Sequence, residues 1–187
     1  LHYPLRRQRQ MCIRDRVIDL LQHKTDVAIR FGTLHDSSLH AKLVCKSRLY
    51  IVASPDYLEQ AGIPQTPQAL LQHQLVGFSK PVYLNTWPLK IGDDYVTVSP
   101  KIKASSGETV RQLTLAGHGI ARLSEYEIWQ DLEAGRLVAL FEDQIELQYQ
   151  HIHAVYYQQK HLPKRVRLFI EFLADELSQQ FSTAVAS

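Results

Sequence analysis

Apolar positions recur along the chain with two spacings, and together they predict alternating strands and helices. Short apolar runs, typical of buried strands, occur at residues 26–29, 49–54, 75–78, 120–123, 137–141 and 151–157. Apolar positions three or four residues apart, typical of one helix face, occur at residues 15–24, 56–62, 69–73, 110–116, 125–133 and 166–177. Gly92-Asp93-Asp94 predicts a hairpin turn between two further strands. This alternation predicts an α/β fold.

The stretch from Ala104 to Ser124 combines a helix start, a glycine turn and a strand. Ser105 stands three residues before Glu108, the spacing of a capping box. Gly117 and Gly119 can supply the left-handed residue that ends the helix. Because the N–H groups of a helix start favour an anionic or polar ligand, this stretch is a candidate wall of a binding site. Most capping boxes only start a helix, so both interpretations stay open.

Two breaks in the pattern divide the chain into subdomains. Ser79-Lys80-Pro81 ends one strand, and residues 161–164 precede the last helix, whose predicted buried stripe is Val166, Phe169, Ile170, Leu173 and Leu177. We expect the chain to cross between subdomains at both breaks. The predicted fold is α/β with two Rossmann-like subdomains of mostly parallel sheet, residues 17–78 with 160–187 and residues 79–159, and with a ligand cleft between them.

The composition is that of an ordinary soluble protein. The 187 residues are 45% hydrophobic, and none of the apolar runs approaches the ~18 residues of a membrane span. Cys12 and Cys45, the two cysteines, lack C-x-x-C spacing, which favours a reducing compartment. The net charge is +2, but residues 1–16 hold five arginines against one aspartate, so this segment carries +4 and the rest of the chain −2.

Residues 1–16 form an atypical basic segment without strand or helix periodicity. Two interpretations remain: sequence foreign to the domain, or a basic interaction arm. We favour the first because no aromatic or glycine residues are interleaved with the arginines. Beyond residue 16 we expect no basic cluster that would indicate DNA binding.

The search for chemistry gives no catalytic or metal site. His151 and His153 share one face of a strand, but a third ligand at diagnostic spacing is missing. Cys45 has the surroundings of a small buried residue, and Asp93 and Asp94 form a turn pair. Neither a G-x-S-x-G motif nor a phosphate loop is present. We therefore expect no enzyme activity and no cofactor.

Two arginines close apolar strand runs at their carboxyl ends. Arg30 follows residues 26–29, and Arg122 follows Ala121. A guanidinium at such a place needs a partner, and a ligand carboxylate can supply a bidentate one. An internal Asp or Glu is the simpler partner for either arginine alone.

Several sequence runs resemble those of one known protein family, and they occur in the same order as in that family. D-R-V-I-D-L-L and D-V-A-I-R-F-G-T-L-H-D-S-S-L-H-A are followed by L-Y-I-V-A-S-P-D-Y-L, A-L-L-Q-H-Q-L-V-G-F-S, S-S-G-E, L-A-G-H-G-I-A-R-L, D-L-E-A-G-R-L-V and H-A-V-Y-Y-Q-Q-K-H-L-P-K-R-V-R-L-F-I-E-F-L. The chain, from roughly Asp15 to Leu177, resembles the effector-binding domain of LysR-type transcriptional regulators. The family's winged helix-turn-helix, linker helix, first strand and first helix are absent. Because the chain also opens without Met, we expect a fragment.

The resemblance implies a cytoplasmic sensor with the type 2 periplasmic-binding-protein-like fold. It implies a small anionic metabolite in the cleft, a homodimer or tetramer built partly on the helix at residues 17–24, DNA contact only through the missing winged helix-turn-helix, and no membrane. A periplasmic solute-binding protein is the alternative. The expected effector-binding residues are Phe31, Gly32, Ser79, Ser105, Ser106, Gly107 and Ser124, with Arg30 and Arg122 added from the strand ends.

Overall fold

The computed structural model describes residues 26–32, 34, 39–157 and 162–181. The helix expected at residues 15–24 and the basic segment 1–16 lie outside these residues. The strands are β1 (Ala28–Phe31), β2 (Leu39–Ala53), β3 (Val76–Phe78), β4 (Thr86–Ile91), β5 (Asp94–Thr97), β6 (Ile102–Ala104), β7 (Ala121–Ser124), β8 (Val138–Leu140) and β9 (Tyr149–Tyr157). The helices are α1 (Pro55–Ala61), α2 (Pro67–Leu70), the 3-10 helix η1 (Val82–Asn85), α3 (Gly107–Leu115), α4 (Glu125–Glu133) and α5 (Lys164–Gln180).

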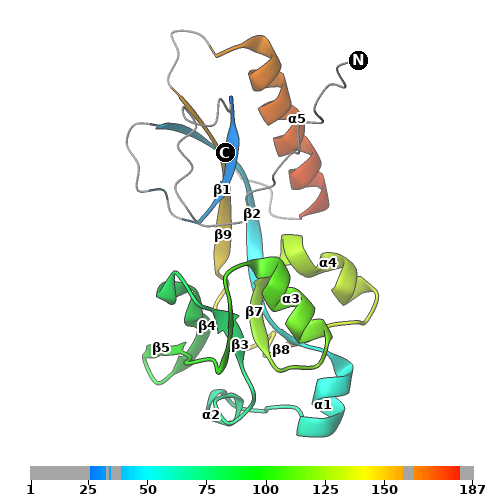
Figure 1. The fold of residues 1–187 in the computed structure, drawn as a ribbon. Helices are drawn as coiled ribbons and strands as arrows, with labels where there is room; N and C mark the ends of the chain where they lie inside the picture. Colours follow the sequence, from blue (N-terminus) through cyan, green and yellow to red (C-terminus); the bar gives the residue numbers. More distant parts are fainter. Residues whose placement is uncertain (1–25, 33, 35–38, 158–161, 182–187) are drawn as a thin grey trace, which may run out of the picture.

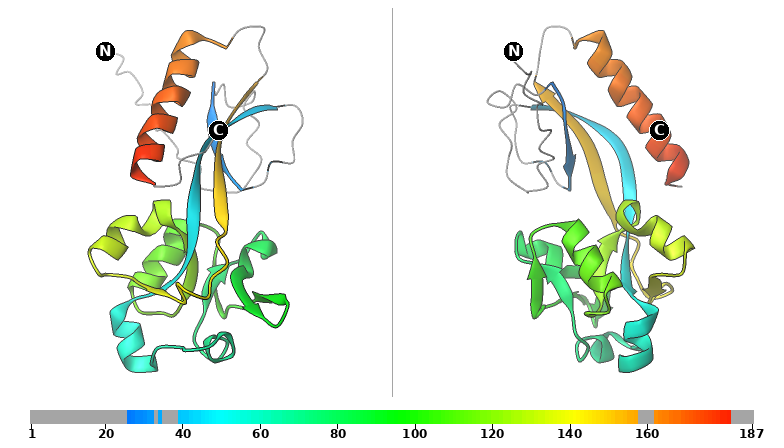
Figure 2. Two further views of the ribbon diagram at one scale, coloured as in Figure 1. Left: turned by 180° about the vertical axis from the view of Figure 1, so that it is seen from behind. Right: turned by 45° about the vertical axis from the view of Figure 1, so that its right-hand side comes forward.

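Strand β2 runs through both halves of the molecule and changes partners on the way (Figure 1). Its residues 39–48 pair with β9, whereas residues 49–53 pair with β7 and β8. The upper subdomain contains β1, β9 and the first part of β2, with α5 covering one face of this sheet (Figure 2). All remaining elements form the lower subdomain.

This passage within β2 differs from the crossing expected at Ser79-Lys80-Pro81. Leu58 and Leu70, which precede that break, share one buried cluster with Trp87 and Leu89, which follow it. Ser79-Lys80-Pro81 ends strand β3, but the same hydrophobic core continues on both sides of it. These three residues therefore mark a bend inside the lower subdomain, while the continuous strand β2 connects the two halves.

The strand directions also differ in part from the expected mostly parallel sheets. Strands β3 and β6 are parallel, and a parallel bridge joins Leu75 to Ile120. The pairs that involve β2, and those of β1 with β9 and β4 with β5, are antiparallel. Strands β2 and β9 run antiparallel to their neighbours, whereas the two strands of a strand–helix–strand unit are parallel.

Helix α5 packs through the predicted stripe with one exception. Val166 and Ile170 are buried, and Leu173 and Leu177 pack against the same upper core. Phe169 was expected in this stripe but is 46% exposed. The physical reason is its angular position, about 100° from Ile170 around the helix, which moves its ring off the sheet-facing side.

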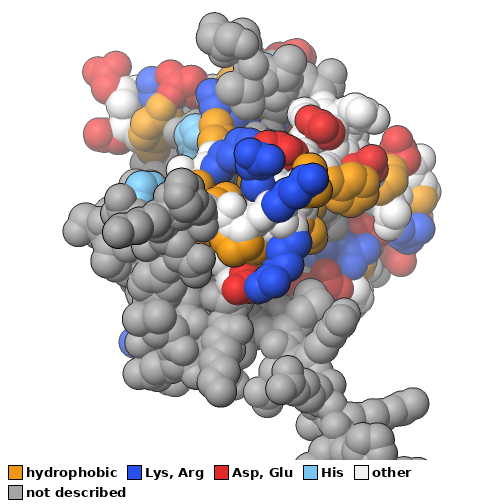
Figure 3. Space-filling model, turned by 90° about the horizontal axis from the view of Figure 1, so that it is seen from above, with side chains coloured by type: hydrophobic (Ala, Val, Ile, Leu, Met, Phe, Trp, Pro, Cys, Tyr) orange, Lys and Arg blue, Asp and Glu red, His pale blue; other side chains and the backbone are white. Residues whose placement is uncertain are grey.

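Lys and Arg side chains gather on the face of the molecule seen from above (Figure 3). The start of α5 contributes Lys164, Arg165 and Arg167, all exposed. Arg165 forms an exposed ion pair with Asp26 at 3.2 Å. The start of this helix therefore places three cations on one turn, and whether they contact DNA remains a prediction.

Candidate functional site

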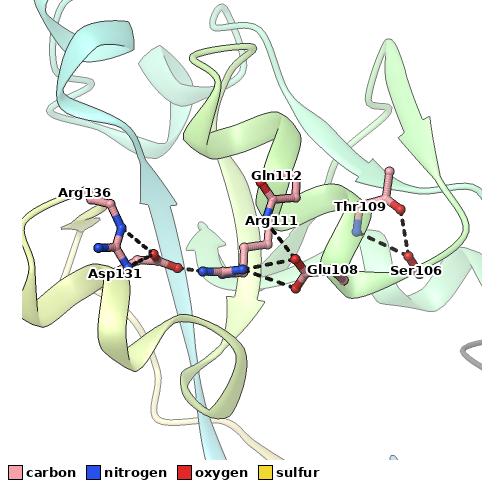
Figure 4. Close-up of polar contacts among 7 residues, drawn as sticks. All are labelled: Ser106, Glu108, Thr109, Arg111, Gln112, Asp131 and Arg136. Atoms are coloured by element: carbon pink, nitrogen blue, oxygen red, sulfur yellow. Dashed lines mark hydrogen bonds and ion pairs between the residues drawn. The ribbon is translucent and has the colours of Figure 1, made fainter. Parts of the chain in front are cut away.

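Helix α3 begins one residue later than the capping-box spacing predicts. Its N-cap is Ser106, whose Oγ accepts a hydrogen bond from the Thr109 N–H at 3.2 Å. Glu108 pairs with Arg111 instead of turning back to the backbone (Figure 4). The box expected between Ser105 and Glu108 is therefore wrong. The backbone of Ser106 is extended, with φ −138° and ψ 149°, which allows the second serine to cap the helix.

The start of α4 carries the capping box of this region. The Ser124 N–H donates to Glu127 Oε2 at 3.4 Å, and the two side chains complete the box. Ser124 is buried, and its Oγ donates to the Gln150 side-chain oxygen in β9. The Tyr126 N–H donates to Ser47 Oγ in β2 at 3.0 Å. The first turn of α4 is therefore held by both strands that connect the subdomains.

The end of β1 approaches the lower subdomain at two places. The Phe31 ring stacks on Tyr126, with centroids 5.0 Å apart and planes 10° from parallel. Gly32 lies beside η1, since a Cβ added to it would stand 3.8 Å from the Tyr83 hydroxyl oxygen. Phe31 and Tyr83 remain 42% and 61% exposed. Their rings therefore offer apolar surface at the junction of the subdomains.

The serines of the lower subdomain meet where β3 and β6 end. These strands pair in parallel, so their carboxyl ends lie at the same edge. The Ser79 N–H and Oγ both donate to the Ala104 carbonyl oxygen, at 2.8 and 3.3 Å. Ser105 and Ser106 follow Ala104 directly and lead into Gly107 at the start of α3.

Arg122 is the cation of this region. It precedes Ser124 by two residues on β7, so the two side chains leave the same face of the strand. Its Nε is enclosed and has no hydrogen-bond partner among the described residues. Burial lowers the pKa of Arg122 to about 10, with an opposing contribution from the charge of Glu127. At neutral pH this guanidinium is charged, and an enclosed N–H of a charged group without an acceptor is costly.

Arg30 does not join this group. It neighbours Phe31 on β1, and strand alternation places it on the opposite face. Its partner across the sheet is His153, whose ring stacks on His151 at 6.0 Å. Burial, with a contribution from His151, lowers the pKa of His153. Among the described residues, no cluster of three His, Cys, Asp or Glu side chains that could hold a metal is present.

Helices α3 and α4 are connected by an ion pair that involves a buried carboxylate (Figure 4). Asp131 is fully buried and accepts from Arg111 of α3 at 2.6 Å and from Arg136 at 2.8 Å. Burial alone would raise the pKa of Asp131, but the hydrogen bonds from the two arginines hold it below its usual value. This cluster fixes how the starts of α3 and α4 face each other.

Cys45 fits the expectation of a small buried residue. It is 1% exposed, and burial raises the pKa of its thiol to about 11. At neutral pH the group is a thiol, which is a poor nucleophile.

The family of the chain follows from comparison with known proteins. A model of the LysR substrate binding domain matches residues 10–178. The chain belongs to this family. CrgA from Neisseria meningitidis, an HTH-type transcriptional regulator, is 41% identical over 162 residues, which are 86% of this chain and 54% of CrgA. TtdR from Escherichia coli, a transcriptional activator, is 34% identical over 163 residues, or 86% of this chain and 52% of TtdR.

The solved relatives confirm the two-subdomain LysR fold. The CrgA regulatory domain superposes with a TM-score of 0.80 at 40% identity, covering 86% of this chain and 79% of that one. The chain spans about half the length of the curated relatives given above. These relatives are transcriptional regulators, which favours the regulator over the periplasmic solute-binding alternative. Among the described residues, no helix is long and apolar enough to cross a membrane.

Within this LysR domain, sequence reasoning missed several residues at the junction. Tyr126 and Tyr83 face the end of β1, and Gln150 binds Ser124. These contacts join segments that are far apart in the chain, so no local sequence pattern predicts them. Glu127 was detectable, because Ser124 stands three residues before it at capping-box spacing.

Proposed function

We propose that the chain is an effector-sensing domain that binds a small anionic metabolite at the junction of its two subdomains. The observation that carries this proposal is the enclosed Nε of Arg122, which lacks a hydrogen-bond partner among the described residues. A ligand carboxylate satisfies such a guanidinium with charge-assisted, bidentate hydrogen bonds. Ser79, Ser105 and Ser106 supply further donors at the edge where β3 and β6 end.

The aromatic rings give the ligand an apolar wall. Phe31 and Tyr126 stack across the junction, and Tyr83 lies beside Gly32. A ligand that contacts both sides holds the subdomains in one relative arrangement. Ligand binding in this proposal shifts the population between arrangements, because the ligand contacts both subdomains fully in only one of them.

In the longer protein this change acts on DNA through a winged helix-turn-helix in a homodimer or tetramer in the cytoplasm. The LysR family membership and the regulators among its relatives support this part of the proposal. The domain performs no turnover in this proposal.

The test uses small carboxylates and their neutral analogues. Phenylacetate, hexanoate and acetate are compared with phenylacetamide, hexanamide and acetamide by calorimetry and by the shift in melting temperature. We expect at least one acid to bind and its amide to fail. Arg122→Gln should abolish binding, while Arg48→Gln, an equal change in charge at another arginine with an unpartnered Nε, should retain it. Equal binding to wild type and Arg122→Gln would contradict the proposal.

A further inference from the structure

Glu127 already places a carboxylate at the start of α3. A Cβ added to Gly107, the first residue of that helix, would stand 2.8 Å from the Glu127 carboxyl carbon. The positive end of a helix favours a negative charge at this position. The place that the sequence assigned to the anionic group of an effector is therefore approached by the protein's own carboxylate.

The same carboxylate lies within electrostatic reach of Arg122. Ser124 holds Glu127 through the capping box, and Ser124 shares a strand face with Arg122. The charge of Glu127 acts on Arg122, although the described residues give this arginine no ion pair. One positive and one negative group therefore flank the proposed binding position without neutralising each other by direct contact.

We propose that Glu127 competes with the effector's anionic group, so that the domain binds small carboxylates together with a proton. This inference rests on the proposed function. When Glu127 is ionised, an incoming carboxylate near Arg122 meets a like charge in a partly enclosed site. When Glu127 is protonated, the full charge of Arg122 is available to the ligand. By linkage, the ligand in turn raises the proton affinity of Glu127.

The surroundings of Glu127 suit this role. Burial raises its pKa above the usual range, against the opposing effects of the Ser124 N–H, Tyr126 and Arg122. The other charged group that acts on it is Glu108 of α3, which raises its pKa further. Tyr83 of η1 also acts electrostatically on Arg122. Anion affinity should therefore increase as the pH falls, because protonation removes the competing charge.

Glu127→Gln separates this role from a structural one. Glutamine has the same size and keeps the capping box, in which Gln serves as well as Glu, but it carries no charge. Glu125→Gln is the matched control, since Glu125 lies in the same first turn of α4 and bears the same charge. We measure phenylacetate binding by calorimetry between pH 5 and pH 8, with phenylacetamide as the neutral analogue, and repeat it in two buffers of different ionisation enthalpy.

We expect wild-type affinity for phenylacetate to fall as the pH rises through the raised pKa of Glu127, with proton uptake on binding in that part of the range. Glu127→Gln should bind phenylacetate more tightly than wild type at pH 8 and lose both the pH dependence and the proton uptake. Glu125→Gln should keep the wild-type pH dependence and proton uptake. If Glu127→Gln keeps the wild-type profile, the inference fails while the proposed function stands. If neither protein binds phenylacetate at any pH and the other acids also fail, both are overturned.

Discussion

Asp131 of α4 and Arg111 of α3 form an ion pair between two helices whose starts both face the subdomain junction. Asp131 Oδ2 lies 2.6 Å from Arg111 Nε, and Asp131 is fully buried. Arg136 forms an ion pair with the other carboxylate oxygen of Asp131, Oδ1. Because both oxygens are used, the pair fixes the distance between α3 and α4, and with it the position of Glu127 against Gly107.

Asp131→Asn should destabilise the domain by about 2–3 kcal/mol, because a buried amide then faces two guanidinium groups and one charge-assisted partner is lost. The exposed fraction of the Arg136 side chain, 54%, keeps the cost below that of a fully enclosed pair. Urea unfolding measures the change. Glu146→Gln, which breaks the exposed pair with Lys90, is the control and should change stability by less than about 1 kcal/mol. Equal effects of the two variants would contradict the assignment.

The contribution of Asp131 should also depend on pH with a defined sign. Its pKa is lowered in the folded protein, so its stabilising effect is fully present above the usual aspartate pKa of about 3.9. The effect is lost as the pH falls through the lower folded pKa. The difference in unfolding free energy between wild type and Asp131→Asn should be constant from about pH 7 to pH 5 and shrink below about pH 4. A difference that grows on acidification would refute this account.

Ser106→Ala should cost about 1 kcal/mol through the lost cap of α3. Ser105→Ala, one residue earlier, should change stability by less than about 0.5 kcal/mol, because the Ser105 side chain does not cap the helix. Thermal and urea unfolding of the two variants compare them directly. If Ser105→Ala is the more costly change, the helix begins where the capping-box spacing placed it.

The sequence predicted most elements but not how they divide into subdomains. The helix at residues 125–133 is found as predicted, and the predicted strand at 49–54 is the last part of β2. Local spacing determines such elements. The partner change within β2 depends instead on pairing with β7, β8 and β9, which lie far along the chain. Long-range pairing leaves no signal in a short window of sequence.

The candidate site shows the same division between local and distant information. The start of α3 was found because helix starts have a local pattern, although the cap was placed at Ser105, one residue too early. Ser106 and Gly107 were expected at the site from the family resemblance. The contact of Phe31 with Tyr126 was not predicted, since it joins β1 to α4 across the junction. Whether the expected effector-binding residues contact an effector remains a prediction.

Gly107→Ala should destabilise the domain by about 1–3 kcal/mol, because the added methyl group would collide with the Glu127 carboxylate. The backbone of Gly107 itself is not the obstacle, since it lies in a helix with negative φ. Glu127→Ala in the same chain should therefore remove most of the cost of Gly107→Ala. A double-mutant cycle by urea unfolding measures this coupling. Additive effects of the two substitutions would place Glu127 away from the start of α3.

The basic start of α5 predicts DNA binding that is weak and independent of sequence. Lys164, Arg165 and Arg167 can each neutralise one phosphate, so together they should steepen the slope of log affinity against log salt by no more than about 2.7, in addition to any contribution from the arginines of residues 1–16. Fluorescence anisotropy with duplexes of unrelated sequence measures this slope for the chain by itself. Lys164→Glu should reduce the affinity equally for every duplex.

Lys101→Glu is the matched control for that experiment, because Lys101 is exposed but precedes β6 in the lower subdomain. It makes the same change in net charge away from α5, and it should weaken binding less than Lys164→Glu. Base-specific discrimination requires side chains that reach base edges in a groove, and three cations on one helical turn supply only phosphate contacts. If the chain bound one duplex selectively at physiological salt and Lys164→Glu kept this selectivity, a surface that recognises bases would have to lie elsewhere in the chain.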